Sequence, residues 1–360
     1  MNKQITVMVT LFLVFSVLLF SVDKKQELYL KAIAEKSPEV KIQLLKDYVL
    51  AYGEDKNDKF MRFIYLNMAD TTYRVKNYDE TIQFGEKALE YPDVDQNNKL
   101  RMCLYLANAY FITKKDLVKA NKYADTTIEI ATKIANQAGI IEKDKEKAEQ
   151  LVLNYKTAFI APAYRIQASI LYTNGDIPQA AVKALEAFNS DKSENSSKTV
   201  LSLAVNLYQK GKVDDAIKIA EQIIDPLKPK FQEANFLATA YYKQGNKDKA
   251  VTYFELAYKA KPSAEQALRL GQLIYKKDAE KAIEYFADSF ILSSQNKESE
   301  AFKYLQQLYF NQVAKDKTEE EKEAGYNAIL AAATARVNVD TENATATEST
   351  EKPVDEPIQN

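Results

Sequence analysis

Two segments of this chain repeat one another at an offset of 34 residues. The first runs from Leu203 to Ile217 and the second from Leu237 to Val251, and both carry a Leu-Ala pair, a glycine and an alanine at matching places. This period is the length of one helix–turn–helix unit, and such a unit cannot bury its apolar face without a neighbour. The repeat therefore predicts a stack of helical hairpins.

The same unit recurs on both sides of this pair, which gives six copies between about residues 60 and 292. Each copy has a small residue on its first helix: Ala69, Ala107, Ala168, Ala204, Ala238 and Gly271. Each also has a small residue on its second helix: Thr81, Ala120, Ala180, Ala216, Ala250 and Ala282. Small side chains at both places let the two helices approach closely. Gly175, Gly211 and Gly245 fall just past a first helix, where a left-handed residue ends it at no steric cost.

The best copy, residues 237–262, resembles the tetratricopeptide repeat, and the resemblance covers roughly residues 60–292. The tryptophan usual in that family is absent, because the chain has no Trp; Tyr65 and Cys103 stand at its place in the first two copies. The resemblance implies an all-α fold, namely a right-handed superhelical solenoid of stacked antiparallel helix pairs, with about six repeats plus degenerate terminal pairs. It also implies a protein that holds other proteins.

Two further helix pairs are expected to flank the repeats, so that the solenoid covers residues 23–336. Ser37-Pro38 is typical of an N-cap followed by proline at the first helical position, and Thr318 to Glu321 has the pattern of a capping box. Residues 136–158 form an insertion rich in lysine and glutamate, which we interpret as lengthened helices.

Residues 1–22 differ in kind from the rest. Lys3 precedes an apolar run from Ile5 to Val22, which is either a signal peptide or an N-terminal membrane anchor. The run is close to the ~20 residues needed to span a bilayer and lacks a clear small-x-small cleavage pattern, so an anchor is favoured. Because the segment resembles a bacterial signal sequence, we expect an exported protein that is periplasmic, or inner-membrane-anchored and facing the periplasm.

The composition at the other end changes after Arg336. Residues 337–360 are acidic, rich in threonine and poor in large apolar side chains, which predicts a disordered tail. The whole chain has a net charge of −2, so it has no basic field suited to nucleic acid.

Catalytic chemistry finds little support in the residue types. The chain has no histidine, which excludes histidine-based acid–base catalysis and histidine metal ligands. No glycine-rich phosphate-binding pattern occurs, and the single cysteine, Cys103, stands at a core position. We therefore expect a protein that is not an enzyme and that has no catalytic residues, no metal site and no cofactor.

An aromatic residue occupies one position of every repeat, two residues before the expected end of the first helix: Tyr73, Phe111, Tyr172, Tyr208, Tyr242 and Tyr275. In the family that this chain resembles, nearby first-helix positions line a concave groove, and the polar residues predicted there include Asn108, Arg165, Asn235 and Gln272. Aromatic side chains at one superhelical position offer a large contact area to an extended peptide.

Two hypotheses follow from this pattern. The first is a non-enzymatic scaffold of the bacterial cell envelope that binds a protein or peptide segment in the groove. The second is a structural subunit that associates with itself through the ends or the convex face of the solenoid, for which the insertion at 136–158 is the supporting feature.

Overall fold

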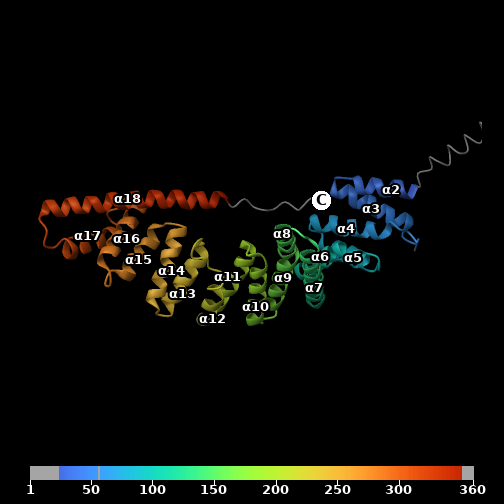
Figure 1. The fold of residues 1–360 in the computed structure, drawn as a ribbon, viewed down its shortest axis with the longest axis horizontal. Coiled ribbons are helices and arrows are strands. Elements are labelled where there is room, and N and C mark those ends of the chain that lie inside the picture. The colour runs from blue at the N-terminus through green and yellow to red at the C-terminus, as the bar shows by residue number, and fades with distance from the viewer. Residues whose placement is uncertain (1–23, 56, 351–360) are drawn as a thin grey trace, which may run out of the picture. The chain divides into compact units, whose positions relative to one another are not determined.

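The computed structural model describes residues 24–55 and 57–350, in which helices alternate with short turns and no strand occurs (Figure 1). The contacts divide the chain into two compact units, Met1–Ser196 and Ser197–Asn360. Each unit is a stack of helix pairs, so the predicted all-α solenoid is confirmed within each of them.

Unit 1 places successive helices against one another in chain order. Its helices are α2 (Lys24–Ala34), α3 (Pro38–Tyr52), α4 (Met61–Arg74), α5 (Tyr78–Leu89), α6 (Gln96–Thr113), α7 (Leu117–Ile141), α8 (Lys145–Tyr155), the π-helix η1 (Lys156–Ile160), α9 (Ala161–Thr173) and α10 (Ile177–Asp191). Leucine, methionine and alanine side chains from neighbouring pairs share continuous cores; Leu45, Met68 and Met102 belong to one of these clusters and Leu106 and Ala163 to the next.

Unit 2 begins at Ser197, which lies in the first turn of α11. Its helices are α11 (Glu194–Gln209), α12 (Val213–Ala220), α13 (Phe231–Lys243), α14 (Lys247–Ala260), α15 (Ala264–Ile274), α16 (Ala279–Leu292), α17 (Glu300–Leu308), the π-helix η2 (Tyr309–Val313) and α18 (Glu319–Thr350). Phe254, Leu270 and Phe286 are its largest fully buried apolar side chains, together with Leu237 and Leu305.

The turn between the two helices contains a residue with left-handed backbone in five of the six repeats; the turn between α15 and α16 has none. Gly175, Gly211 and Gly245 have φ values of 84°, 80° and 84°, as the sequence predicted. The first two repeats lack this glycine, yet Lys76 and Lys114 adopt φ values of 60° and 54° at the end of the first helix. A side chain is disfavoured in this region, so these two lysines hold a conformation that glycine would adopt more easily.

The second helix of each flanking pair begins with the predicted cap. The Ser37 side chain accepts a hydrogen bond from the Val40 amide, and Pro38 is the first residue of α3. Before α18, Thr318 Oγ1 accepts from the Glu321 amide, and Glu321 Oε2 accepts from the Thr318 amide at 2.8 Å, which completes a capping box.

The insertion lengthens helices, as predicted. α7 continues to Ile141, and after a short turn α8 runs into α9 through the π-helical turn Lys156–Ile160. Pro162 explains this turn, because proline cannot donate to the carbonyl one turn earlier and its ring crowds that carbonyl. The wider turn is closed instead by the Ala161 amide, which donates to the Lys156 carbonyl.

The C-terminal helix α18 packs against α16. Arg336 Nη2 lies 2.9 Å from Asp288 Oδ1, and the Asp288 side chain is 4% exposed. The sequence predicted an unfolded tail from residue 337, but Val337 is buried and α18 continues to Thr350. No glycine or proline lies between Gly325 and Pro353, so no residue type that breaks helices ends α18 at the predicted boundary. Residues 351–360 lie outside the described residues.

The predicted signal or anchor segment, residues 1–22, also lies outside the described residues. Among the helices that the structure does describe, none has the length and the hydropathy to cross a membrane.

Candidate binding surface

The six predicted aromatic residues all lie at the C-terminal ends of first helices. Each follows the small residue of its repeat by four positions, so it lies one turn further along the same face. Tyr73, Phe111 and Tyr172 belong to unit 1, on α4, α6 and α9. In unit 2, Tyr208 and Tyr242 lie on α11 and α13, and Tyr275 directly follows α15.

In unit 1, the Tyr73 ring is held between neighbouring first helices. It stacks on Tyr105 of α6 with 3.9 Å between ring centroids and 9° between planes, and Asn108 Nδ2 donates to the Tyr73 hydroxyl at 2.8 Å. Tyr105 in turn donates to Asp70 at 3.1 Å. Burial raises the pKa of both tyrosines, so each remains neutral at physiological pH. The sequence predicted Tyr73 and Asn108 as neighbours of a ligand, and the structure shows that they also bind each other.

The other predicted residues of unit 1 differ in exposure. Phe111 packs against the core cluster around Leu106, whereas Tyr172 is 43% exposed. Arg165 Nη1 contacts Asp191 Oδ2 at 3.1 Å and donates to Ser196 Oγ at 2.9 Å, so its guanidinium is already engaged within the unit. Of this set, Tyr172 has the ring most accessible to a partner.

In unit 2, a lysine side chain lies over the ring of one of the predicted aromatic residues, Tyr208. The Lys243 ammonium lies 4.5 Å from the Tyr208 ring centroid, and Phe236 meets the same ring edge-on at 5.9 Å. Tyr242, the residue before Lys243, is 54% exposed. A ring beside a cation attracts both apolar groups and carboxylates, so this surface can bind a peptide of mixed character.

Two of the predicted residues line one hollow. A cavity of about 800 Å³ lies between α14 and the end of α15, and both Gln272 and Tyr275 line it. Gln272 Nε2 donates to Glu300 Oε2 at 3.3 Å, and the Tyr275 ring lies 6.4 Å from that of Tyr304. Asn235 is not part of this hollow; its side-chain oxygen accepts from Gln266 at 3.4 Å.

The aromatic residues that pack on these rings escaped the sequence prediction. Tyr105 and Phe236 each stand two residues before the small residue of their repeat, but the other four repeats have Asn67, Ile166, Ser202 and Arg269 there. Aromatic residues therefore do not recur at this position of the repeat, and the sequence periodicity could not have identified Tyr105 and Phe236. The binding role of the predicted residues themselves stays a prediction.

A second recurring cluster joins the second helices. In unit 1, Glu86 accepts from Tyr110 at 2.7 Å and from Lys119 at 2.8 Å, and Tyr123 donates to the same oxygen at 3.3 Å. Unit 2 repeats the arrangement around Glu221: it accepts hydrogen bonds from Tyr241, Lys249 and Tyr253.

These clusters keep their carboxylates ionised. Burial acts to raise the pKa of Glu86, but the hydrogen bonds from Lys119 and Tyr110 outweigh it and hold that pKa below its ordinary value. The pKa of Glu221 is lowered in the same way against the same opposition from burial. A carboxylate of this kind is a poor general acid near neutral pH.

The remaining candidates for reactive chemistry are the Cys103 thiol and a metal site. Cys103 is buried, and burial raises the pKa of its thiol to about 11, so it carries little of the reactive thiolate at neutral pH. Across the part of the chain that the structure describes, no cluster of cysteine, aspartate and glutamate side chains is arranged to hold a metal ion.

Comparisons with known proteins give similarity at the level of solved structures. No protein-family model matches the chain, and no curated protein matches it. A tetratricopeptide repeat protein of Parabacteroides merdae matches at 14% identity over 79% of this chain and 98% of its own, with a TM-score of 0.39. The C-terminal part of a repeat-containing protein of Cytophaga hutchinsonii, also of the tetratricopeptide type, matches at 15% identity over 78% and 98%, with a TM-score of 0.43. A Thermus thermophilus protein of this type matches at 12% identity over 75% and 98%, with a TM-score of 0.24.

Proposed function

We propose that this chain, a tetratricopeptide-repeat protein by its fold, is a non-enzymatic scaffold whose first helices bind a segment of another protein. The observation that carries the proposal is the surface of unit 2 around Tyr242. This ring is 54% exposed, and the next repeat adds the hollow lined by Tyr275 and Gln272.

The chemistry of this surface indicates the kind of segment that it would bind. Tyr242 and Tyr275 offer aromatic faces, Lys243 and Lys276 lie next to them in the sequence, and Gln272 supplies an amide. Aromatic side chains provide most binding energy where they pack against apolar groups, and the lysines favour carboxylates. A segment with apolar anchors and interspersed acidic residues fits this combination better than a uniformly charged one.

The absence of catalysis is part of the proposal. Glu86 and Glu221, two carboxylates with lowered pKa values, are bound by tyrosine and lysine side chains, and the Cys103 thiol is buried. These contacts hold the two carboxylates and the thiol within the fold, which supports a structural role for them.

The proposal also includes export, with residues 1–22 as the targeting segment and the repeats on the periplasmic side of the inner membrane. Its support is the apolar run behind Lys3 at the start of the sequence. Protease protection in spheroplasts tests it: we expect added protease to digest the repeats in intact spheroplasts. Digestion only after lysis would contradict export.

Photo-crosslinking tests the binding surface. A crosslinkable phenylalanine derivative replaces Tyr242 in the full chain, and the control carries it at Lys218, which is exposed on the second helix α12. We expect one partner, identified by mass spectrometry, from position 242 only. Equal capture from both positions would refute the proposed surface.

Affinity measurements then show whether the crosslinked residue contributes to binding or only lies near the partner. The identified partner's segment is synthesised, and its Kd is measured with the unmodified chain, with Tyr242→Ala and with Lys218→Ala. We expect Tyr242→Ala to weaken binding by more than ~10-fold, because loss of a buried aromatic anchor costs at least ~1.4 kcal/mol. Lys218→Ala should leave the Kd unchanged.

A further inference from the structure

The end of α7 and the whole of α8 form a hairpin, residues 136–156, that is longer than a repeat requires. α7 has 25 residues, whereas α14, the second helix of another repeat, has 14. At ~1.5 Å per residue, α7 is roughly 16 Å longer. α8 packs against α7 along this extra length.

Large apolar side chains of the hairpin are exposed. Ile140 and Ile141 are 83% and 77% exposed, and Leu153 on α8 is 46% exposed. Ile134 packs against the core cluster around Leu100, and Ile141 lies two turns later on the same face of α7. The apolar stripe of α7 therefore continues past the core of unit 1, where no described side chain covers it.

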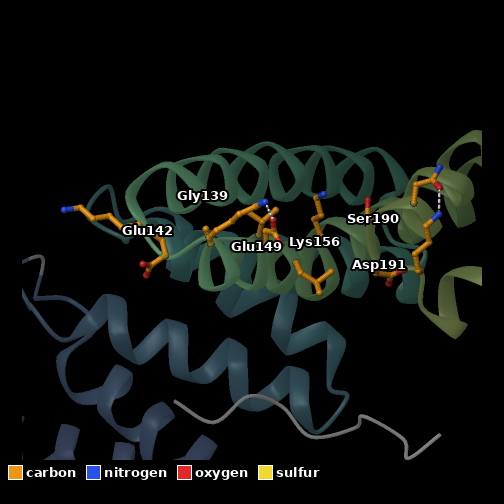
Figure 2. A pocket seen from close by; sticks show the side chains of 13 residues that line it. Gly139, Glu142, Glu149, Lys156, Ser190 and Asp191 are labelled. Atoms are coloured by element: carbon orange, nitrogen blue, oxygen red, sulfur yellow. Dashed lines mark hydrogen bonds and ion pairs between the residues drawn. The ribbon is translucent and has the colours of Figure 1, made fainter. Parts of the chain in front are cut away.

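Beside this stripe lies a hollow of about 700 Å³, between the hairpin and the end of α10 (Figure 2). Ala148 and Val152 contribute apolar lining, and Figure 2 shows Glu142 at one end of the hollow and Asp191 at the other. Gly139 also lines the hollow, and a Cβ there would make only an ordinary contact with the Val152 side chain, at 3.5 Å.

The charges of the hairpin are balanced and intermixed. Residues 136–156 carry four acidic and four basic side chains: Glu142, Asp144, Glu146, Glu149, Lys143, Lys145, Lys147 and Lys156. The ion pairs Lys145–Glu149 and Lys147–Asp144 both span 3.8 Å between largely exposed side chains. Such pairs contribute little to stability, so these charges can exchange partners readily.

This pattern distinguishes between possible occupants. A strongly acidic or basic partner would meet as many repelling charges as attracting ones. A twofold interface, by contrast, sets the same patch against itself, so that each lysine can meet a glutamate of the other copy. We propose that the α7–α8 hairpin is a homodimerisation surface, in which the exposed isoleucines of each copy fill the hollow of the other. This inference is independent of the proposed partner surface in unit 2.

Sedimentation velocity of the full chain in dodecyl maltoside tests the proposal. We expect a dimer, and we expect Ile140→Glu with Ile141→Glu to raise the dimer Kd by ~100-fold or more. The control is Val118→Glu, which places one such charge on the same helix, far from the hairpin, at a residue that is 81% exposed. A monomeric unmodified chain at ~50 μM, or an unchanged Kd in the double variant, would overturn the proposal.

A second experiment, in which the charges of the hairpin are reversed, distinguishes loss of the interface from misfolding of a variant. One full chain carries Lys143→Glu, Lys145→Glu and Lys147→Glu. Another carries Glu142→Lys, Glu146→Lys and Glu149→Lys, which leaves Asp144 in place as the N-cap of α8. Each alone should be monomeric, because like charges then face one another. Mixing the two should restore a heterodimer, and failure to do so would contradict the proposed interface.

Discussion

Gly271 offers a sharp test of how the repeats pack. It lies in α15 against the ring of Phe286 on α16, and a Cβ at this position would lie 2.5 Å from Phe286 Cε1 and 2.7 Å from Cδ1. Phe286 is fully buried and stacks on Tyr304 with 5.0 Å between centroids. The ring therefore cannot move aside without disturbing the next helix pair.

The substitution Gly271→Ala changes stability through two opposing effects. Alanine favours the helical backbone by ~1 kcal/mol relative to glycine. Forcing a methyl group into a filled core costs ~1–3 kcal/mol. We therefore expect a net loss of up to ~2 kcal/mol in the free energy of unfolding of unit 2, although helix propensity alone predicts a gain.

Urea unfolding followed by far-UV circular dichroism measures this loss. Glu284→Ala and Glu284→Gly supply the control, because Glu284 is exposed on α16 in the same unit. The difference between the unfolding free energies of these two variants gives the effect of helix propensity alone. That value is then subtracted from the change in unfolding free energy caused by Gly271→Ala. If Gly271→Ala stabilised the protein by as much as that difference, the argument from the close contact with Phe286 would be refuted.

Three further predictions rest on single contacts. Arg336→Ala should loosen α18, because it removes the guanidinium that pairs with the buried Asp288 carboxylate, at a cost of ~3 kcal/mol; faster amide hydrogen exchange along α18 is the measurement. Lys76→Gly should raise the free energy of unfolding by ~1 kcal/mol in a urea titration, because it relieves the left-handed side chain, whereas Lys122→Gly inside α7 should lower it by a similar amount. The lowered pKa of Glu86 contributes stability that is present above the ordinary glutamate pKa and is lost as pH falls through the folded-state value, so Glu86→Gln should flatten the decline in melting temperature below about pH 4.5.

Much of the fold could be predicted from sequence because its rules are local. The small residues at fixed positions, the turn glycines such as Gly245 and the caps at Ser37 and Thr318 each act within one repeat or one turn. The left-handed lysines are different. No residue type marks Lys76 and Lys114, since their conformation is imposed by the packing of the helices on either side.

The candidate surface was predictable in position but not in exposure. Periodicity located Tyr73 and Tyr242 at equivalent places. Whether a ring is free for a partner depends on what the next helix presents: Tyr105 stacks on Tyr73, whereas Tyr242 remains 54% exposed. Such a contact joins residues about one repeat apart and follows from side-chain shape, which the repeat pattern does not encode.

The tyrosine–lysine clusters around Glu86 and Glu221 have a consequence for how the chain melts. Each couples a second helix to the repeat that follows it, and in a linear array such nearest-neighbour coupling decides how many repeats unfold together. Because the two clusters lie in different units, we expect two cooperative transitions, each spanning one unit, so that a single midpoint temperature does not describe the molecule.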